Sequence, residues 1–135
     1  MGKKIIPKRV GPWPYPRTDG KNRIGSFDEI QIGFTESEAI EEANRCILCP
    51  VPACVKACPV NLDVLGMMGH IQEKNFGEAY KVIRETNCIP GSTARVCPQL
   101  DDLCEANCVI SKRGDPLSIG MLQRLLLIGV LSMKK

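Results

Sequence analysis

The stretch Cys46-Ile-Leu-Cys49-Pro-Val-Pro-Ala-Cys54-Val-Lys-Ala-Cys58-Pro59 places four cysteines at spacings of two, four and three intervening residues. An iron–sulfur cubane needs thiolates that approach four irons from different directions. A loop from Cys46 to Cys54 can supply three of them, but the fourth ligand usually comes from elsewhere in the chain. Cys58 is therefore expected to point into a second cluster.

A second group of cysteines lies near the end of the chain. Cys97 is followed by Pro98, and Cys104 and Cys108 repeat the spacing of three residues. The bacterial ferredoxin pattern C-x2-C-x2-C-x3-C-P also sends its fourth cysteine to the other cluster, although the longer gap here makes this a different sequence. The two groups could complete two [4Fe–4S] centres and so tie the halves of the chain together. Cys88 stands alone between them.

Two other uses of the eight cysteines stay open. Structural zinc sites usually show two C-x2-4-C pairs, and only Cys46 and Cys49 form such a pair. Disulfides belong to oxidising compartments, whereas the N-terminus shows no secretory signal and the apolar run 125–131 is shorter than the roughly 20 residues that span a bilayer. We therefore expect a cytoplasmic protein with reduced thiols, and the small net charge of +3 gives nucleic-acid binding little support.

The rest of the chain predicts a mostly α-helical domain without strands. Prolines at 7, 12, 14 and 16 favour an extended arm over residues 1–24, followed by one domain over 25–135. Thr35 and Glu38 form a capping box that should start the first helix. Further helices are expected at 62–74, 77–86, 103–109 and 117–133, from their apolar spacing.

Few other residues suggest chemistry. Glu41 and Glu42 are expected to be solvated or capping charges, His70 a surface or packing residue, and the pair Met67-Met68 part of the core. No catalytic carboxylate pair or nucleophile–base arrangement is evident. The chain also lacks the G-x-G-x-x-G fingerprint, so it carries no recognisable flavin or nicotinamide site of its own.

Taken together, the cysteine motifs and the sequence around them resemble the N-terminal iron–sulfur domain of the glutamate synthase small (β) subunit. Similar domains occur in dihydropyrimidine dehydrogenase and in the large subunit of NADH-dependent ferredoxin:NADP oxidoreductases. The likeness covers residues 22 to about 124. It is carried by the segments Asn22–Ile30, Gly33–Glu36, Ala39–Cys46, Cys54–Val60, Ile83–Asn87, Arg95–Gln99 and Ile119–Arg124.

The resemblance implies an α-helical ferredoxin fold with two [4Fe–4S] clusters. It assigns the first cluster to Cys46, Cys49, Cys54 and Cys108. It assigns the second to Cys58, Cys97, Cys104 and a non-cysteine ligand on the final helix, where Gln123 stands. Cys88 occupies a position where proline is common in the family, so Cys88 is the alternative eighth ligand.

The resemblance also implies a function. Members of the family relay electrons between a flavin and a second catalytic subunit or domain, and their chains normally run on into a flavin-binding domain. We expect an electron-transfer subunit of a multi-subunit oxidoreductase, with FAD on a flavoprotein partner and not on this chain. There are two alternatives. One is a structural or assembly module in which the metal only stabilises the fold, and the other is a catalytic [4Fe–4S] protein with an open iron.

The last expected helix is apolar on all sides. One face of a domain cannot bury residues spread around a helix in this way, and unpaired apolar area on a surface often marks an interface. We therefore expect the C-terminal helix to dock the flavoprotein partner, through residues such as Leu127 and Leu131. The alternative is a helix fully buried in the domain's own core.

Overall fold

The computed structural model describes residues 17–31, 33–99, 101 and 103–132, with side chains as far as residue 128. It is a mostly helical fold with irregular loops that bear the cysteines, as the sequence predicted. Within the described residues, β pairing is confined to one isolated antiparallel bridge between Arg17 and Gln31. The elements in chain order are α1 (Gly20–Arg23), α2 (Glu36–Asn44), α3 (Ala53–Lys56), α4 (Val64–Gln72), α5 (Phe76–Thr86), α6 (Pro90–Val96), the 3-10 helix η1 (Val109–Lys112) and α7 (Ile119–Ser132).

The predicted start of α2 is confirmed. The Thr35 hydroxyl accepts a hydrogen bond from the Glu38 backbone N–H, and the Glu38 carboxylate accepts one from the Thr35 backbone N–H. These bonds satisfy two donors that a helix start otherwise leaves unpaired. They also hold the pKa of the Glu38 carboxyl below its usual value.

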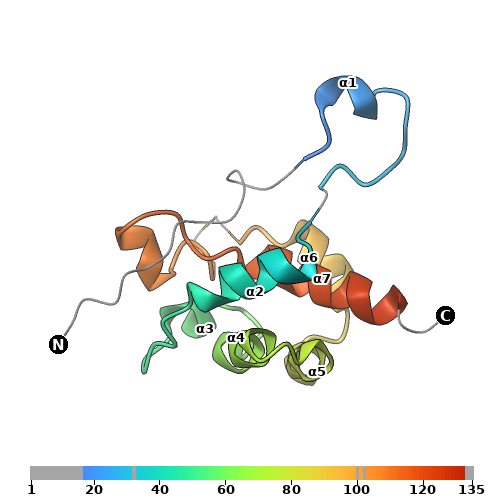
Figure 1. Cartoon of the computed structure of the whole chain (residues 1–135). Helices are drawn as coiled ribbons and strands as arrows, with labels where there is room; N and C mark the ends of the chain where they lie inside the picture. Colours follow the sequence, from blue (N-terminus) through green and yellow to red (C-terminus); the bar gives the residue numbers. More distant parts are fainter. Residues whose placement is uncertain (1–16, 32, 100, 102, 133–135) are drawn as a thin grey trace.

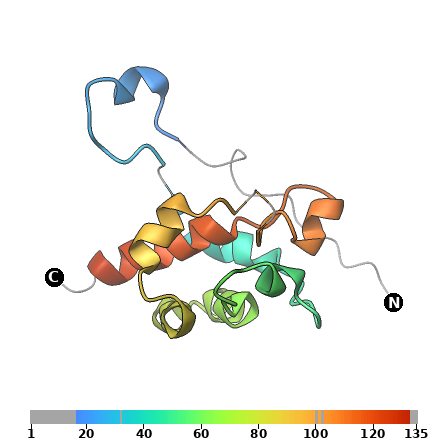
Figure 2. The same ribbon diagram turned by 180° about the vertical axis from the view of Figure 1, so that it is seen from behind.

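α4 and α5 lie side by side below α2 and α7 (Figures 1 and 2). The Asp63 carboxylate caps α4 by accepting from the Gly66 backbone N–H at 3.0 Å. A Cβ at Gly66 would come close to that carboxylate, so the Asp63 side chain would have to shift if another residue stood there. Met67 and Met68 are fully buried, which confirms them as core residues.

α7 runs through the centre of the domain and packs against α2, α5 and α6. Its apolar side chains up to Leu127 are buried by this chain, apart from the half-buried Leu125. The surrounding helices cover it on several sides, which is why apolar residues can stand all round it. The expectation that Leu127 is free to dock a partner is therefore wrong, and the side chain of Leu131 lies outside the described residues.

The structure corrects two expected elements and adds a helix that was not expected. Residues 20–23 form one helical turn inside the arm that was expected to be extended, while residues 1–16 lie outside the description. The helix expected at 103–109 is instead a set of turns that leads into η1. α6 was not predicted, although Pro90 at its first turn is a recognised start signal.

Glu42 is also a correction, because it is fully buried and not solvated. Its Oε1 accepts from Arg45 Nη1 at 2.6 Å and from the Ser118 backbone N–H at 2.9 Å. Arg45 in turn donates to the backbone oxygen of Asp115 at 2.7 Å. This ion pair joins the end of α2, just before Cys46, to the start of α7.

No helix in the described part of the chain is long and apolar enough to cross a membrane.

We expect Glu42→Gln to destabilise the fold by about 3 kcal/mol, because it leaves the buried Arg45 without its counter-charge. The apparent thermal midpoint of the cluster-loaded protein, measured at one scan rate, should fall by about 10 °C. Glu41 is exposed one residue away, so Glu41→Gln is the matched control and should change stability by no more than about 0.5 kcal/mol. Equal midpoints for the two variants would show that the pair contributes little.

Candidate metal centres

Four of the predicted ligands surround one cavity. Cys46, Cys49, Cys54 and Cys108 line it together. Helix ends place three of them: Cys46 comes directly after the cap of α2, Cys54 lies in the first turn of α3, and Cys108 is the N-cap of η1. The other lining residues are aliphatic: Ile47, Ala53, Val64, Leu65, Val109, Ile110, Leu117 and Ile119.

The electrostatics of Cys54 show how close these thiols are. The pKa of Cys54 is raised to about 11, first by burial and then by the neighbouring thiols of Cys108, Cys46 and Cys49. Each neighbour disfavours a negative charge on Cys54, as like charges do. A cation in the middle would reverse this effect, because a coordinating thiol is deprotonated outright.

The remaining predicted ligands line a second, separate cavity. Cys58, Cys97, Cys104 and Gln123 meet there, with Asn87, Thr93, Gln99 and Leu103 among their neighbours. Its volume is about 200 Å³, whereas the first cavity, closed in by aliphatic side chains, has a volume of about 20 Å³. Three segments converge here: the residue after α3, the loop after α6, and the buried interior of α7.

Cys58 therefore lines a different cavity from Cys54, although only three residues separate the two in the sequence. Burial raises the pKa of Cys104, and the carboxylate of Glu105 and the thiols of Cys58 and Cys97 raise it further. The pKa of Cys97 is raised by burial and next by Cys58. The first cysteine motif thus contributes to both cavities, as its spacing suggested.

Cys88 and Gln123 differ sharply in position. Cys88 is exposed in the turn after α5 and lines neither cavity. Gln123 is buried on α7 and its side chain lines the second cavity. Of the two candidates for the eighth ligand, the fold brings only Gln123 to the other three.

Three residues that the sequence analysis missed shape the second cavity. Glu105 is fully buried and accepts a hydrogen bond from the Gly120 backbone N–H at 2.9 Å, which fixes the first turn of α7. The Gln99 side chain packs directly on Gly120, where any Cβ would overlap with it. Glu105 lies between Cys104 and Ala106, and a charged residue in a segment with no helical periodicity carries no signal of burial.

A buried arginine holds residues 29–31 beside the same cavity. Arg124 donates to the Gln31 side chain at 2.8 Å and to Glu29 at 2.7 Å, and Arg95 also donates to Glu29 at 2.7 Å. The hydrogen bond from Arg95, helped by the charge of Arg124, keeps the pKa of Glu29 below its usual value. Arg124 follows Gln123, and Arg95 lies two residues before Cys97.

The donor sets suit a polynuclear cluster. None of the eight cysteines forms a disulfide. Among the described residues, no three His, Cys, Asp or Glu side chains meet at a point where one ion could sit. The thiols instead line cavities, four around the first and three with an amide around the second. Four thiolates are the usual ligands of [4Fe–4S] clusters.

Comparison with known families agrees with this chemistry. Residues 23–133 match the family described as dihydropyrimidine dehydrogenase domain II, 4Fe-4S cluster. The NAD-dependent dihydropyrimidine dehydrogenase subunit PreT of Salmonella typhimurium is 41% identical over 98 residues, which are 73% of this chain and 24% of that protein.

Glutamate synthase small chains are similar too. The [NADPH] small chain of Azospirillum brasilense is 43% identical over 90 residues, which are 67% of this chain and 18% of that protein. That of Escherichia coli is 34% identical over 117 residues, or 87% of this chain and 24% of that protein. The chain thus spans about a quarter or less of the length of these relatives.

We expect Cys54→Ser and Cys108→Ser to remove the same cluster, because the two thiols line one cavity from opposite ends of the chain. EPR spectra of the reduced proteins should lack the same signal in both variants. Cys58→Ser is the matched control: it lies four residues from Cys54 but lines the other cavity, so it should remove the other signal. Loss of one common signal in Cys54→Ser and Cys58→Ser would contradict this pairing.

Cys88 should be the one thiol that iodoacetamide labels in the cluster-loaded protein, because it is exposed and lines neither cavity. Cys88→Ser should abolish the labelling and leave the iron content unchanged, as measured by mass spectrometry and iron assay. Gln123→Ala should alter the spectrum of one cluster only. Iron loss in Cys88→Ser with normal clusters in Gln123→Ala would make Cys88 the ligand.

Proposed function

The chain belongs to the dihydropyrimidine dehydrogenase domain II family of 4Fe-4S cluster domains, and we propose that it is an electron-transfer subunit carrying two such clusters. Cys46, Cys49, Cys54 and Cys108 hold the first cluster. Cys58, Cys97, Cys104 and Gln123 hold the second. The observation that carries the proposal is the separation of the ligand candidates into two cavities, each with four of them.

When bound, a [4Fe–4S] cluster accepts and releases single electrons, at a potential set by its ligands, its burial and the hydrogen bonds around it. The residues of this chain set those conditions. Aliphatic side chains such as Val64, Leu117 and Ile119 exclude water from the first centre. A neutral amide from Gln123 makes the second ligand set one charge less negative, which favours reduction at that centre.

Burial of the thiols has a consequence for assembly. Burial, and next the neighbouring thiols and Glu105, raise the pKa values of Cys54 and Cys104 and so disfavour their thiolates. A cluster bound in each cavity would stabilise the thiolate there. Metal binding and folding are coupled in such sites. The clusters therefore bind the 46–58 segment to the 97–108 segment as well as carrying electrons.

The electrons require partners. The relatives are named as NAD- and NADPH-dependent enzymes or their subunits, whereas this sequence has no dinucleotide fingerprint. The relatives hold about three quarters of their length outside the matched region. We therefore place NAD(P)H oxidation, and the FAD that it needs, on a flavoprotein partner. The final acceptor lies on a further catalytic subunit.

The purified protein should contain about eight irons and eight sulfides per chain, since each of the two clusters holds four of each. Dithionite should bleach the visible absorption reversibly under anaerobic conditions. Cys58→Ser should keep about half of the iron and remain reducible, because the other centre has its own four ligands.

The rival function is a structural module in which metal only staples the fold. Zinc in place of iron, or clusters that dithionite does not reduce, would support that rival and overturn electron transfer. Chelation should unfold the protein under either function, so it serves only as a check that metal and fold are coupled.

A further inference from the structure

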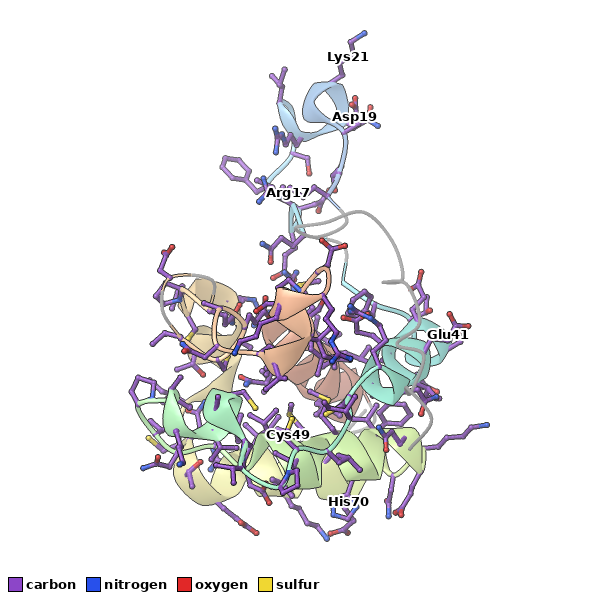
Figure 3. The ribbon with its side chains drawn as sticks, turned by 90° about the vertical axis from the view of Figure 1, so that its left-hand side faces the viewer. Arg17, Asp19, Lys21, Glu41, Cys49 and His70 are labelled. Carbon is purple, nitrogen blue, oxygen red and sulfur yellow. The ribbon has the colours of Figure 1, made fainter. Side chains whose placement is uncertain are left out.

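Residues 19–31 form a lobe that projects from the body of the domain, on the side away from α4 and α5 (Figure 1). In Figure 3 the labelled side chains of Asp19 and Lys21 stand at its far end, and Cys49 lies on the body. The lobe carries three exposed apolar side chains within seven residues: Ile24, Phe27 and Ile30. Phe27 is fully exposed and Ile24 is 87% exposed.

Exposure of an aromatic side chain is unusual in the described part of this chain. Its aromatic content is only 4%, and elsewhere Phe34 is buried and Phe76 packs against the core. A single exposed apolar residue needs no explanation, but a group on one projecting segment is typical of an interaction site. Aromatic residues are also the ones that most often dominate binding energy at interfaces.

The lobe is held firmly at its base. Glu29 accepts from Arg95 on α6 and from Arg124 on α7, both at 2.7 Å, and Arg124 also holds the Gln31 side chain. The Thr18 backbone N–H donates to the Ile30 carbonyl at 2.8 Å. A segment held in this way loses little conformational entropy when a partner binds, so more of the contact energy appears as affinity.

The base of the lobe adjoins the second metal centre. A polar recess of about 240 Å³ is lined by Gln31 and Arg95 from the base and by Cys97 and Gln99 from the loop after α6. Cys97 and Gln99 also line the second cavity. A protein that grips the lobe would therefore cover the face where a proposed cluster ligand can be approached from outside.

The length of the relatives indicates what covers this face. Their names include NAD or NADPH, about three quarters or more of their length lies outside the matched region, and the sequence of this chain has no dinucleotide fingerprint. We therefore take the occupant to be a polypeptide that oxidises NAD(P)H. Most side chains of the central helix α7 up to Leu127 are buried in this domain, and Ile128 is the exposed apolar side chain on its described part. The lobe offers the most exposed apolar side chain of the described residues.

We propose that the lobe and the adjoining recess are the docking surface for the NAD(P)H-oxidising flavoprotein, with Phe27 as the central contact. This inference rests on the proposed function, because it takes the flavoprotein as the electron donor. It moves the docking site from the C-terminal helix to the N-terminal lobe. It also brings the donor to the second cluster, the one with the Gln123 ligand.

The test uses cells of the source organism, fractionated for a flavoprotein that reduces the clusters of the purified protein from NADH or NADPH. Increasing concentrations of the wild-type protein or of a variant are added to that fraction, and the initial rate of cluster reduction is followed by the loss of visible absorption. The protein concentration that gives half of the maximal rate is then compared between variants. Phe27→Ser should raise this concentration tenfold or more, and Phe27→Leu should restore most of the affinity. Ile24→Ser should have a smaller effect.

Ile89 supplies the matched control, because it is 61% exposed but lies outside the lobe. Ile89→Ser should change the half-maximal concentration by less than about twofold. All variants should keep their iron content and their reduction by dithionite, since these exposed side chains line neither cavity. This separates lost docking from lost clusters.

Three outcomes would overturn the proposal. Equal rates for Phe27→Ser and wild type would exclude the lobe as the docking surface but leave electron transfer from the flavoprotein intact. A wild-type dimer in sedimentation that Phe27→Ser dissociates would assign the lobe to a second copy of the chain. Clusters that dithionite reduces but no flavoprotein fraction reduces would remove both the donor and this docking site.

Discussion

The convergence of two distant cysteine segments is the constraint on which this fold depends. Cys54 lies against Cys108, whereas Cys58, four residues later, lies against Cys97 and Cys104. A short segment whose cysteines line two cavities cannot move without disturbing both cavities. The helices are arranged accordingly: Cys97 caps the end of α6, Cys108 caps the start of η1, Cys46 follows the cap of α2, and Cys54 lies in the first turn of α3.

Buried charges complete this arrangement in place of a large aromatic core. Glu42 and Arg45 tie the end of α2 to the start of α7, and Glu105 holds the first turn of α7 from the other cysteine segment. Ionic groups are costly to bury, and they repay this only when their hydrogen bonds are well formed. Each one here lies within a few residues of a cysteine, so the polar contacts help to position the cysteines around the two cavities.

The burial of α7 changes where a partner can bind. A helix that is apolar all round invites the conclusion that one side must face another protein. In this fold α2, α5 and α6 surround it, so it acts as the central support that carries Gln123 to the second cavity. The most exposed apolar side chain of the described residues, Phe27, lies instead on a projecting lobe, which Glu29 fixes to the arginines near Cys97 and Gln123.

The sequence by itself determined the chemistry: cysteine spacing predicted two centres shared between the halves of the chain, and local signals such as the capping box at Thr35 predicted α2. The capping box is confirmed and the predicted ligands line two separate cavities, because helix capping and cysteine spacing act over a few residues. Only the tertiary structure decided that Glu42 and Glu105 are buried, that Cys88 faces solvent while Gln123 faces a cavity, and that Leu127 is covered while Phe27 is not. Burial depends on which helices surround a residue, and contacts between residues such as Glu42 and Ser118, 76 positions apart, leave no periodic trace in the sequence.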